Sequence, residues 1–287
     1  MGIKYKQLYL DKSLGPIKFS LLNKPICNIA LSFIDTLKPS LGILQGLLAT
    51  ICNGALETYK AIIFLIDDNN KVKYPLQAQI LLRSILDVLF NVAYLLDDPT
   101  KNVKEYNLAG FRMMQKDLLE RFQADGNDVD GYSSSFKFQK ELDDFATFIQ
   151  LTKEESDNEK GEKPFWPVPK IIKKRLSIEK DKKFFDGIYE KHYGTFSDLS
   201  HFAMRGTALG MYSRMPDSEK VNPGQVESDA ALPAILFLTM IFSEIQSKID
   251  CKMEKDLRYI WTLLSNVREE CREYYSSRYD EILTTRS

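Results

Sequence analysis

The chain has 287 residues, of which 44% are hydrophobic and 28% are charged, so it has enough apolar material for a substantial core. Its 39 Lys and Arg residues balance 40 Asp and Glu residues, and the net charge of -1 excludes a globally basic nucleic-acid-binding protein but not a local basic patch. The four cysteines form no CxxC pair and there are only two histidines, which excludes the usual zinc-ligand spacings and predicts free thiols.

Helical spacing of apolar residues runs through the first half of the chain. Pro25 is expected in the opening turn of the first helix, and Asp98 is expected to cap the fourth. Prolines and clustered Asp and Asn residues provide the breaks between helices. The helices predicted in this half cover residues 24–37, 41–66, 75–96 and 98–123.

The second half of the chain alternates helices with polar loops, and no period-2 pattern indicates a strand. The predicted fold class is therefore all-α, a single large antiparallel helical bundle with two long polar loops. One helical domain spans residues 1–287, with a core over 41–211 completed by C-terminal helices within 229–283. The helices expected here cover 136–151, one or two short stretches within 170–193, and 196–211, 229–249 and 252–283. The loops expected to be mobile are 124–135, 152–163 and 213–228.

A cytoplasmic protein with no membrane partner is expected from the apolar runs. Residues 1–20 carry charges throughout and lack the apolar centre of a signal peptide. The strongest apolar run, 232–242, is much shorter than the ~20 residues of a spanning helix. The stretch 41–56 is interrupted by Gln45, Asn53 and several glycines.

One helix carries more polarity than a buried position requires. Residues 74–96 are apolar on nearly every side, which is typical of a helix that is buried all round. Polar residues nevertheless recur at every fourth position and form one stripe, namely Gln79, Arg83, Asp87 and Asn91. Two interpretations stay open: a structural ion pair between Arg83 and Asp87, or one wall of a polar cavity used for binding or chemistry.

A second stripe, Tyr193, Ser197, His201 and Arg205, also steps by four residues. His201 has apolar neighbours in the sequence, so it is either a satisfied core histidine or an acid–base group. Sites in helical bundles are usually built between facing helices, so the two stripes are expected to share one cavity if they are functional. The catalytic candidates from both stripes are Arg83, Asp87, Tyr193, Ser197 and His201.

Ligand-binding candidates come from the stripes and from the next helix. Tyr106 and Arg112 lie on a helical pattern over 102–120 and would reach inward, although an ordinary amphipathic surface helix explains them equally. Asn91 and Arg205, at the ends of the two stripes, complete the set of candidates.

A basic segment runs from Lys163 to Lys183, with Phe165 and Trp166 near its start. Basic residues beside aromatic ones suit single-stranded RNA or a nucleotide as partner, and a solvated charged helix explains the same pattern. A homodimer is also left open.

Several motifs together resemble a widespread bacterial family of all-helical proteins that is catalogued as a domain of unknown function. The motifs are Arg-Ser-Ile-Leu-Asp from Arg83 to Asp87, the later Trp166, and a Tyr-x3-Ser-x3-His pattern from Tyr193 to His201. The resemblance covers roughly 41–205. The acid of the third helix is more often glutamate in that family, whereas Asp87 stands here. The resemblance implies an all-helical fold and brings no known activity.

A more remote resemblance is to the helical nucleases of prokaryotic toxin and antiphage systems. Those enzymes carry Arg-x4-6-His on one helix, whereas no arginine precedes His201 or His192 at that spacing here. The resemblance therefore implies a site that pairs Arg83 with His201 across helices.

Three functions stay open for this chain. The first is a metal-independent ribonuclease or phosphoryl-transfer enzyme of a bacterial defence or toxin-type system, with His201 as acid or base and Arg83 stabilising the phosphate charge. The second is a sensor that holds a small anionic ligand such as a nucleotide, and the third is a structural or partner-binding protein. No cofactor and no metal are expected, because phosphate-binding glycine loops and di-metal Glu-x-x-His patterns do not occur in the sequence.

Overall fold

Every regular element in the described part of the chain is a helix, which confirms the all-α prediction. The computed structural model describes residues 20–37, 42–66, 74–124, 136–148, 152, 171–172, 176–194, 196 and 230–284. By their contacts these residues divide into two compact units. The first contains the described residues within 1–37, 49–89 and 192–287, and the second contains those within 38–48 and 90–191.

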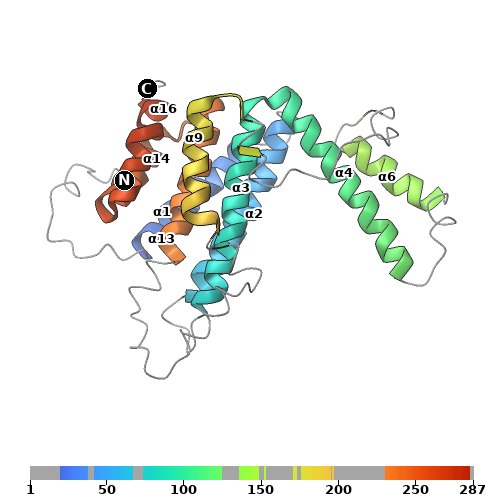
Figure 1. Cartoon of the computed structure of the whole chain (residues 1–287), viewed down its shortest axis with the longest axis horizontal. Helices are drawn as coiled ribbons and strands as arrows, with labels where there is room; N and C mark the ends of the chain where they lie inside the picture. Colours follow the sequence, from blue (N-terminus) through green and yellow to red (C-terminus); the bar gives the residue numbers. More distant parts are fainter. Residues whose placement is uncertain are drawn as a thin grey trace. The chain divides into compact units, whose positions relative to one another are not determined.

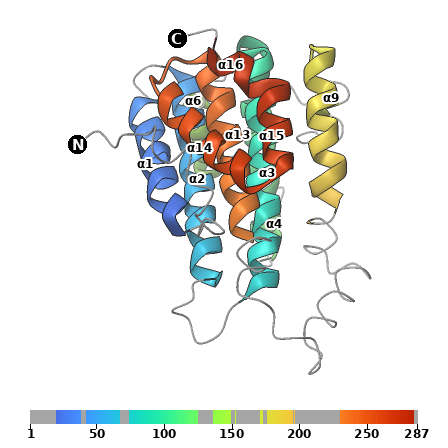
Figure 2. The same cartoon turned by 90° about the vertical axis from the view of Figure 1, so that its left-hand side faces the viewer.

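The core of the first unit is built around α13 (Leu232–Lys248), in which every residue from 234 to 246 is buried. The helices α1 (Ser20–Thr36) and α14 (Glu254–Val267) pack against it and against each other (Figure 2). The ring of Phe33 in α1 stacks on that of Phe242 in α13, with 4.9 Å between centroids. A helix that is buried on all sides must be almost wholly apolar, which explains the long apolar run in this part of the sequence.

Two helices of the described residues are long and apolar enough to cross a membrane, judged by length and composition alone. They are α2 (Ile43–Ile66), with a mean hydropathy of 1.2, and α3 (Pro75–Asp97), whose stretch from Leu76 has a mean hydropathy of 1.5. The share of the apolar window that is buried is 39% in α2 and 56% in α3. The same test is passed by core helices of soluble proteins, and the expectation of a cytoplasmic chain stays a prediction.

The end of the chain differs from the single helix predicted over 252–283. The helix α14 ends at Val267, and Arg268 is extended (φ -141°, ψ 135°). The chain then continues as α15 (Glu269–Tyr274), the π-helical segment η6 (Tyr275–Tyr279) and α16 (Asp280–Thr284). No glycine or proline marks this break. The only local signal is a pair of glutamates at the start of α15, where negative charge is favourable to the helix dipole.

The first helix also begins earlier than predicted. It starts at Ser20, so Pro25 lies inside the helix rather than in its opening turn. Proline has no N–H to donate, so this position lacks one intrahelical hydrogen bond. The structure places the remaining N-terminal helices within two residues of the predicted bounds.

The second unit contains α4 (Pro99–Ala124) packed against α6 (Phe136–Phe148), as Figure 1 shows. The rings of Phe111 and Phe145 stack between these helices, 6.3 Å apart. The same unit holds α9 (Glu179–Ile188), and the π-helical segment η4 (Tyr189–Tyr193) follows α9 directly. Most of the loops predicted at 124–135, 152–163 and 213–228, and all but the first residue of the helix predicted over 196–211, lie outside the described residues.

Candidate functional site

The polar stripe of α3 is half-buried along its length. All four stripe residues, Gln79, Arg83, Asp87 and Asn91, have intermediate exposure, whereas Leu82, Ile85, Leu86 and Leu89 between them are fully buried. The spacing of four residues therefore produces one polar edge on an otherwise buried helix, as the sequence predicted.

Three of the predicted catalytic side chains meet at this edge, all within the first unit. The Arg83 guanidinium carbon lies 5.4 Å from the centroid of the Tyr193 ring, which is cation–π geometry. Arg83 Nε lies 4.0 Å from Asp87 Oδ2, one helical turn further along α3. Hydrogen bonding from the Tyr193 hydroxyl also acts to lower the pKa of the Asp87 carboxyl. The first residue of the second stripe, Tyr193, thus contacts the first stripe.

Opposing effects act on the pKa of the Asp87 carboxyl in this cluster. Burial raises the pKa of the Asp87 carboxyl above its usual range, and the Tyr193 hydrogen bond and the Arg83 charge act in the lowering direction without cancelling that effect. Burial and the nearby Asp87 charge raise the pKa of the Tyr193 hydroxyl, which therefore stays protonated and remains a donor. The cluster thus holds a carboxylate that folding makes harder to ionise, although part of its side chain is exposed.

This conflict leads to a prediction for Asp87→Asn. Below pH 3.8 the carboxyl is protonated in the folded and unfolded states alike, and as the pH rises through the raised folded-state pKa the folded protein loses stability relative to the unfolded chain. The asparagine variant lacks this loss, so its stability relative to wild type should rise between pH 3.5 and pH 7. Urea unfolding across this range measures the difference. A relative stability that falls with rising pH would mean that the Arg83 and Tyr193 interactions outweigh burial.

The structure does not place the other predicted residues relative to this cluster. Asn91, Tyr106 and Arg112 belong to the second unit, where all three are half-buried and burial raises the pKa of Tyr106. Ser197, His201 and Arg205 lie outside the described residues. The basic segment is described at 171–172 and 176–183, where Lys182 pairs with Glu179 at 3.8 Å.

A second polar cluster was not predicted from the sequence. His192 Nε2 lies 2.9 Å from Glu270 Oε1 and 3.1 Å from the Tyr274 hydroxyl oxygen. The Tyr274 hydroxyl donates to the same Glu270 oxygen over 3.1 Å. His192 is the residue next to Tyr193, and the other two side chains come from α15. Only the spacing of four between Glu270 and Tyr274 was visible in the sequence, and it gave no reason to pair them with a histidine about 80 residues earlier.

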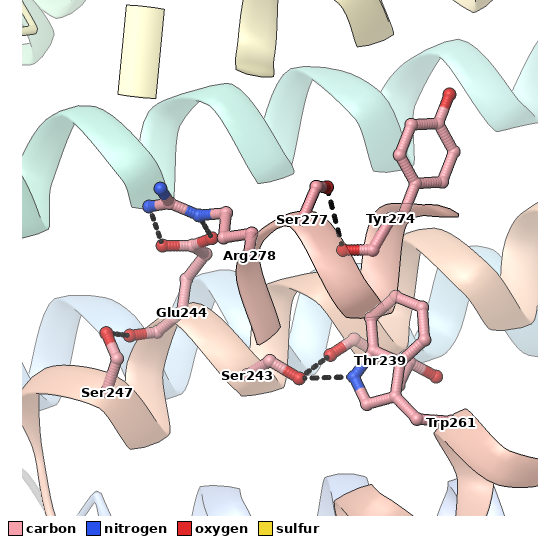
Figure 3. Close-up of polar contacts among 8 residues, drawn as sticks. All are labelled: Thr239, Ser243, Glu244, Ser247, Trp261, Tyr274, Ser277 and Arg278. Carbon is pink, nitrogen blue, oxygen red and sulfur yellow. Dashed lines mark hydrogen bonds and ion pairs between the residues drawn. The ribbon is translucent and has the colours of Figure 1, made fainter. Parts of the chain in front are cut away.

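A third cluster is structural and lies deep in the first unit. Arg278 of η6 makes two hydrogen bonds to Glu244 of α13, from Nε over 2.6 Å and from Nη2 over 2.8 Å (Figure 3). Ser243 of the same helix accepts a hydrogen bond at Oγ from Nε1 of Trp261 in α14, over 3.0 Å. These contacts join α13 to the two helical segments packed on it. Among the described residues, no group of three or more His, Cys, Asp and Glu side chains has metal-ligand geometry.

The fold and the first cluster define the chain as an all-α protein with an Arg–Asp–Tyr cluster on a half-buried helix edge. A family of unknown function (DUF5677) matches residues 45–216, and the chain belongs to this family. The matched range contains both polar stripes, and the resemblance to an all-helical family of unknown function is confirmed. No curated protein matches the chain, and no solved structure does.

Proposed function

We propose that the chain is a metal-independent ribonuclease or a closely related phosphoryl-transfer enzyme, with the substrate phosphate bound at Arg83. The observation that carries the proposal is the convergence of Arg83, Asp87 and Tyr193 at the polar edge of α3. Phosphoryl transfer depends mainly on positioning and on stabilising negative charge, and this cluster offers groups for both tasks.

Arg83 is the anion-binding group in this proposal. A planar guanidinium matches the geometry of phosphate oxygens and stays charged at any physiological pH. Its position over the Tyr193 ring restricts the side chain, so less conformational freedom is lost when an anion binds. The Arg83 side chain is 24% exposed, so solvent and ligands have access to it.

Asp87 and Tyr193 orient Arg83 and hold the edge together. Asp87 attracts the guanidinium from within the helix, and Tyr193 contacts both side chains. In a ribonuclease such a group of neighbours keeps the arginine aimed at the phosphate while negative charge develops in the transition state.

The acid–base chemistry is assigned to the second stripe. His201 follows Tyr193 by eight residues, and an imidazole titrates near neutral pH, which suits a general acid or base. Ser197, midway between them, is proposed to position the substrate. The lysines between Lys163 and Lys183 are proposed to contact the RNA backbone, and a bacterial defence or toxin-type system in the cytoplasm is the proposed setting.

Cleavage of labelled single-stranded RNA in the presence of a chelator tests the proposal. Arg83→Ala is expected to lower the rate constant by about 10²–10³-fold, the typical loss when one charge-stabilising donor is removed. His201→Ala is expected to lower it by about 10²-fold or more. Arg83→Lys should fall between wild type and the alanine variant, because it keeps the charge but loses the planar pair of donors.

Arg272→Ala is the matched control, because Arg272 pairs with Glu269 on an exposed helix face and should cleave like wild type. Equal cleavage by wild type, Arg83→Ala and His201→Ala would refute the proposed ribonuclease site at Arg83 and His201. Circular dichroism of each variant separates loss of function from loss of folding.

A non-catalytic anion sensor is the second candidate, and the cation–π contact of Arg83 with Tyr193 favours it because binding an anion there needs no acid or base. A nucleotide at ~100 times its dissociation constant would add ~2.7 kcal/mol to the stability of wild type. A sensor would keep this shift in His201→Ala and lose it in Arg83→Ala, with no turnover of RNA by either protein.

A further inference from the structure

The cluster around His192 brings three polar side chains together, those of His192, Glu270 and Tyr274. Glu270 Oε1 lies within hydrogen-bond distance of His192 Nε2 and of the Tyr274 hydroxyl. An ionised carboxylate only accepts hydrogen bonds, so the hydrogen of a neutral ring is assigned to Nε2, the nitrogen that lies 2.9 Å from Glu270 Oε1. Burial and the Glu270 charge raise the pKa of Tyr274, which therefore stays a phenol and donates to the same carboxylate.

The proton on Nε2 leaves Nδ1 as the basic nitrogen of the neutral ring. Within the described part of the chain, Nδ1 has no hydrogen-bond partner. A carboxylate that holds one ring nitrogen while the other carries a lone pair is the arrangement used by catalytic histidines and by metal-bound ones.

Aromatic neighbours hold the plane of the ring. Phe196 lies parallel to the imidazole with 6.4 Å between centroids, and Phe237 meets it edge-on at 5.2 Å. The His192 side chain is 13% exposed, so it is packed without being sealed from solvent. Fixed rotation and limited exposure are the conditions under which an imidazole transfers a proton in a defined direction.

His192 also directly precedes Tyr193, a member of the Arg83 cluster, in the chain. His192 and Tyr193 are consecutive, so their Cα atoms are about 3.8 Å apart. Both lie at the end of the π-helical segment η4, and π-helical turns occur frequently at functional sites. A phosphate held at Arg83, over the Tyr193 ring, would therefore lie near the segment that carries His192.

We propose that His192 and Glu270 form an acid–base dyad of the ribonuclease, with Nδ1 of His192 as the atom that takes up the proton. This inference rests on the proposed function and adds a second histidine to it. Metal-independent cleavage of RNA needs a base and an acid, and a single histidine acting in one step supplies only one of them.

In the cleavage step, Nδ1 removes the proton from a ribose 2′-hydroxyl, and the 2′-oxygen attacks the adjacent phosphorus. The bond from phosphorus to the 5′-oxygen breaks, and that oxygen takes a proton from the second acid–base group. The products are a 2′,3′-cyclic phosphate and a free 5′-hydroxyl, and no other reactant is consumed. Glu270 and Tyr274 are positioning residues that hold the ring and its tautomer.

The position of the proton is measured without any activity. The chain has only two histidines, so His201→Ala leaves His192 as its single imidazole. Long-range proton–nitrogen NMR of this variant at pH 8, with nitrogen-15 histidine, reports which ring nitrogen carries hydrogen. The Nε2–H form is expected, and His201→Ala combined with Glu270→Leu should give a mixture of both tautomers. An Nδ1–H form in the protein with Glu270 intact would overturn the dyad.

Cleavage kinetics test the catalytic role. His192→Ala is expected to lower the rate constant at saturating RNA by about 10²-fold or more, while KM changes by no more than about threefold. Tyr274→Phe should retain much more of the rate, because the carboxylate that holds His192 is still present.

The two proposals fail in different ways. If His192→Ala cleaves like wild type while Arg83→Ala does not, the dyad is wrong and the ribonuclease stands. If wild type cleaves no RNA, both the ribonuclease and the dyad's role in it are overturned, whatever tautomer the NMR measurement reports.

Discussion

Glu244→Ala is expected to lower the free energy of unfolding by about 3–5 kcal/mol, the range found when one partner of a buried ion pair is removed. The side chains of Glu244 and Arg278 are 5% and 11% exposed, and two hydrogen bonds of 2.6 and 2.8 Å join them. Figure 3 shows the guanidinium facing the carboxylate between α13 and η6. Removal of Glu244 would leave the charge of Arg278 largely desolvated without its carboxylate partner.

Urea unfolding at pH 7 measures this loss, and an exposed pair on the same unit is the control. Glu269→Ala removes the carboxylate that pairs with Arg272. Both side chains of that pair are more than half exposed, so the free energy of unfolding should change by no more than about 1 kcal/mol. Glu244→Leu combined with Arg278→Met should be more stable than Glu244→Ala, because neither charge is left buried. A loss below about 1 kcal/mol in Glu244→Ala would show that water reaches the guanidinium.

The sequence predicted the helical fold well where the apolar period was uninterrupted. The stretch that became α3 was predicted to end within one residue of Asp97, because Asp98 and Pro99 give a strong stop and restart. The break at Arg268 was missed because its cause is not local. The segments after the break pair with distant parts of the chain, Glu270 with His192 and Arg278 with Glu244, and no glycine or proline marks the break for a sequence-based prediction.

The candidate site was predicted in part, for a related reason. The stripe with Arg83 and Asp87 follows from helical geometry within one segment, and its contact with Tyr193 was an expectation of shared placement. The pairing of His192 with Glu270 could not be predicted, since it joins residues about 80 positions apart. The π-helical turn at 189–193 also changes the angle between successive side chains, and no sequence pattern identifies such turns.

The polar groups carried by the two π-helical segments differ in how far they are buried. The segment η6 carries Arg278, whose pairing with Glu244 is satisfied and buried, so it contributes to register. The segment η4 carries His192 and Tyr193, which contact partially exposed polar side chains of α3 and α15. The side chains of Arg83 and Asp87 are 24% and 40% exposed, those of Arg278 and Glu244 only 11% and 5%, and those of His192 and Glu270 lie between at 13% and 18%. Access to solvent therefore favours a functional role most for the Arg83 cluster.

Trp261→Ala is expected to lower the free energy of unfolding by about 3–5 kcal/mol, the range for truncating a large aromatic side chain in a core. Trp261 is fully buried, and its ring stacks on Tyr279 with 4.9 Å between centroids. Its Nε1–H donates to Ser243 Oγ, which itself donates to the Thr239 carbonyl oxygen over 2.7 Å (Figure 3). The indole therefore contributes apolar volume and one buried hydrogen bond.

A double-mutant cycle with Ser243→Ala separates these two contributions. Ser243→Ala leaves the indole N–H without its acceptor and should cost about 1–3 kcal/mol. Trp261→Phe keeps most of the ring and removes the donor, so its cost should be smaller than that of Trp261→Ala. If the hydrogen bond is real, the double variant Trp261→Phe, Ser243→Ala should cost less than the sum of the single variants, because the second change no longer leaves an indole donor unpaired. Strict additivity would assign the whole effect of Trp261 to packing.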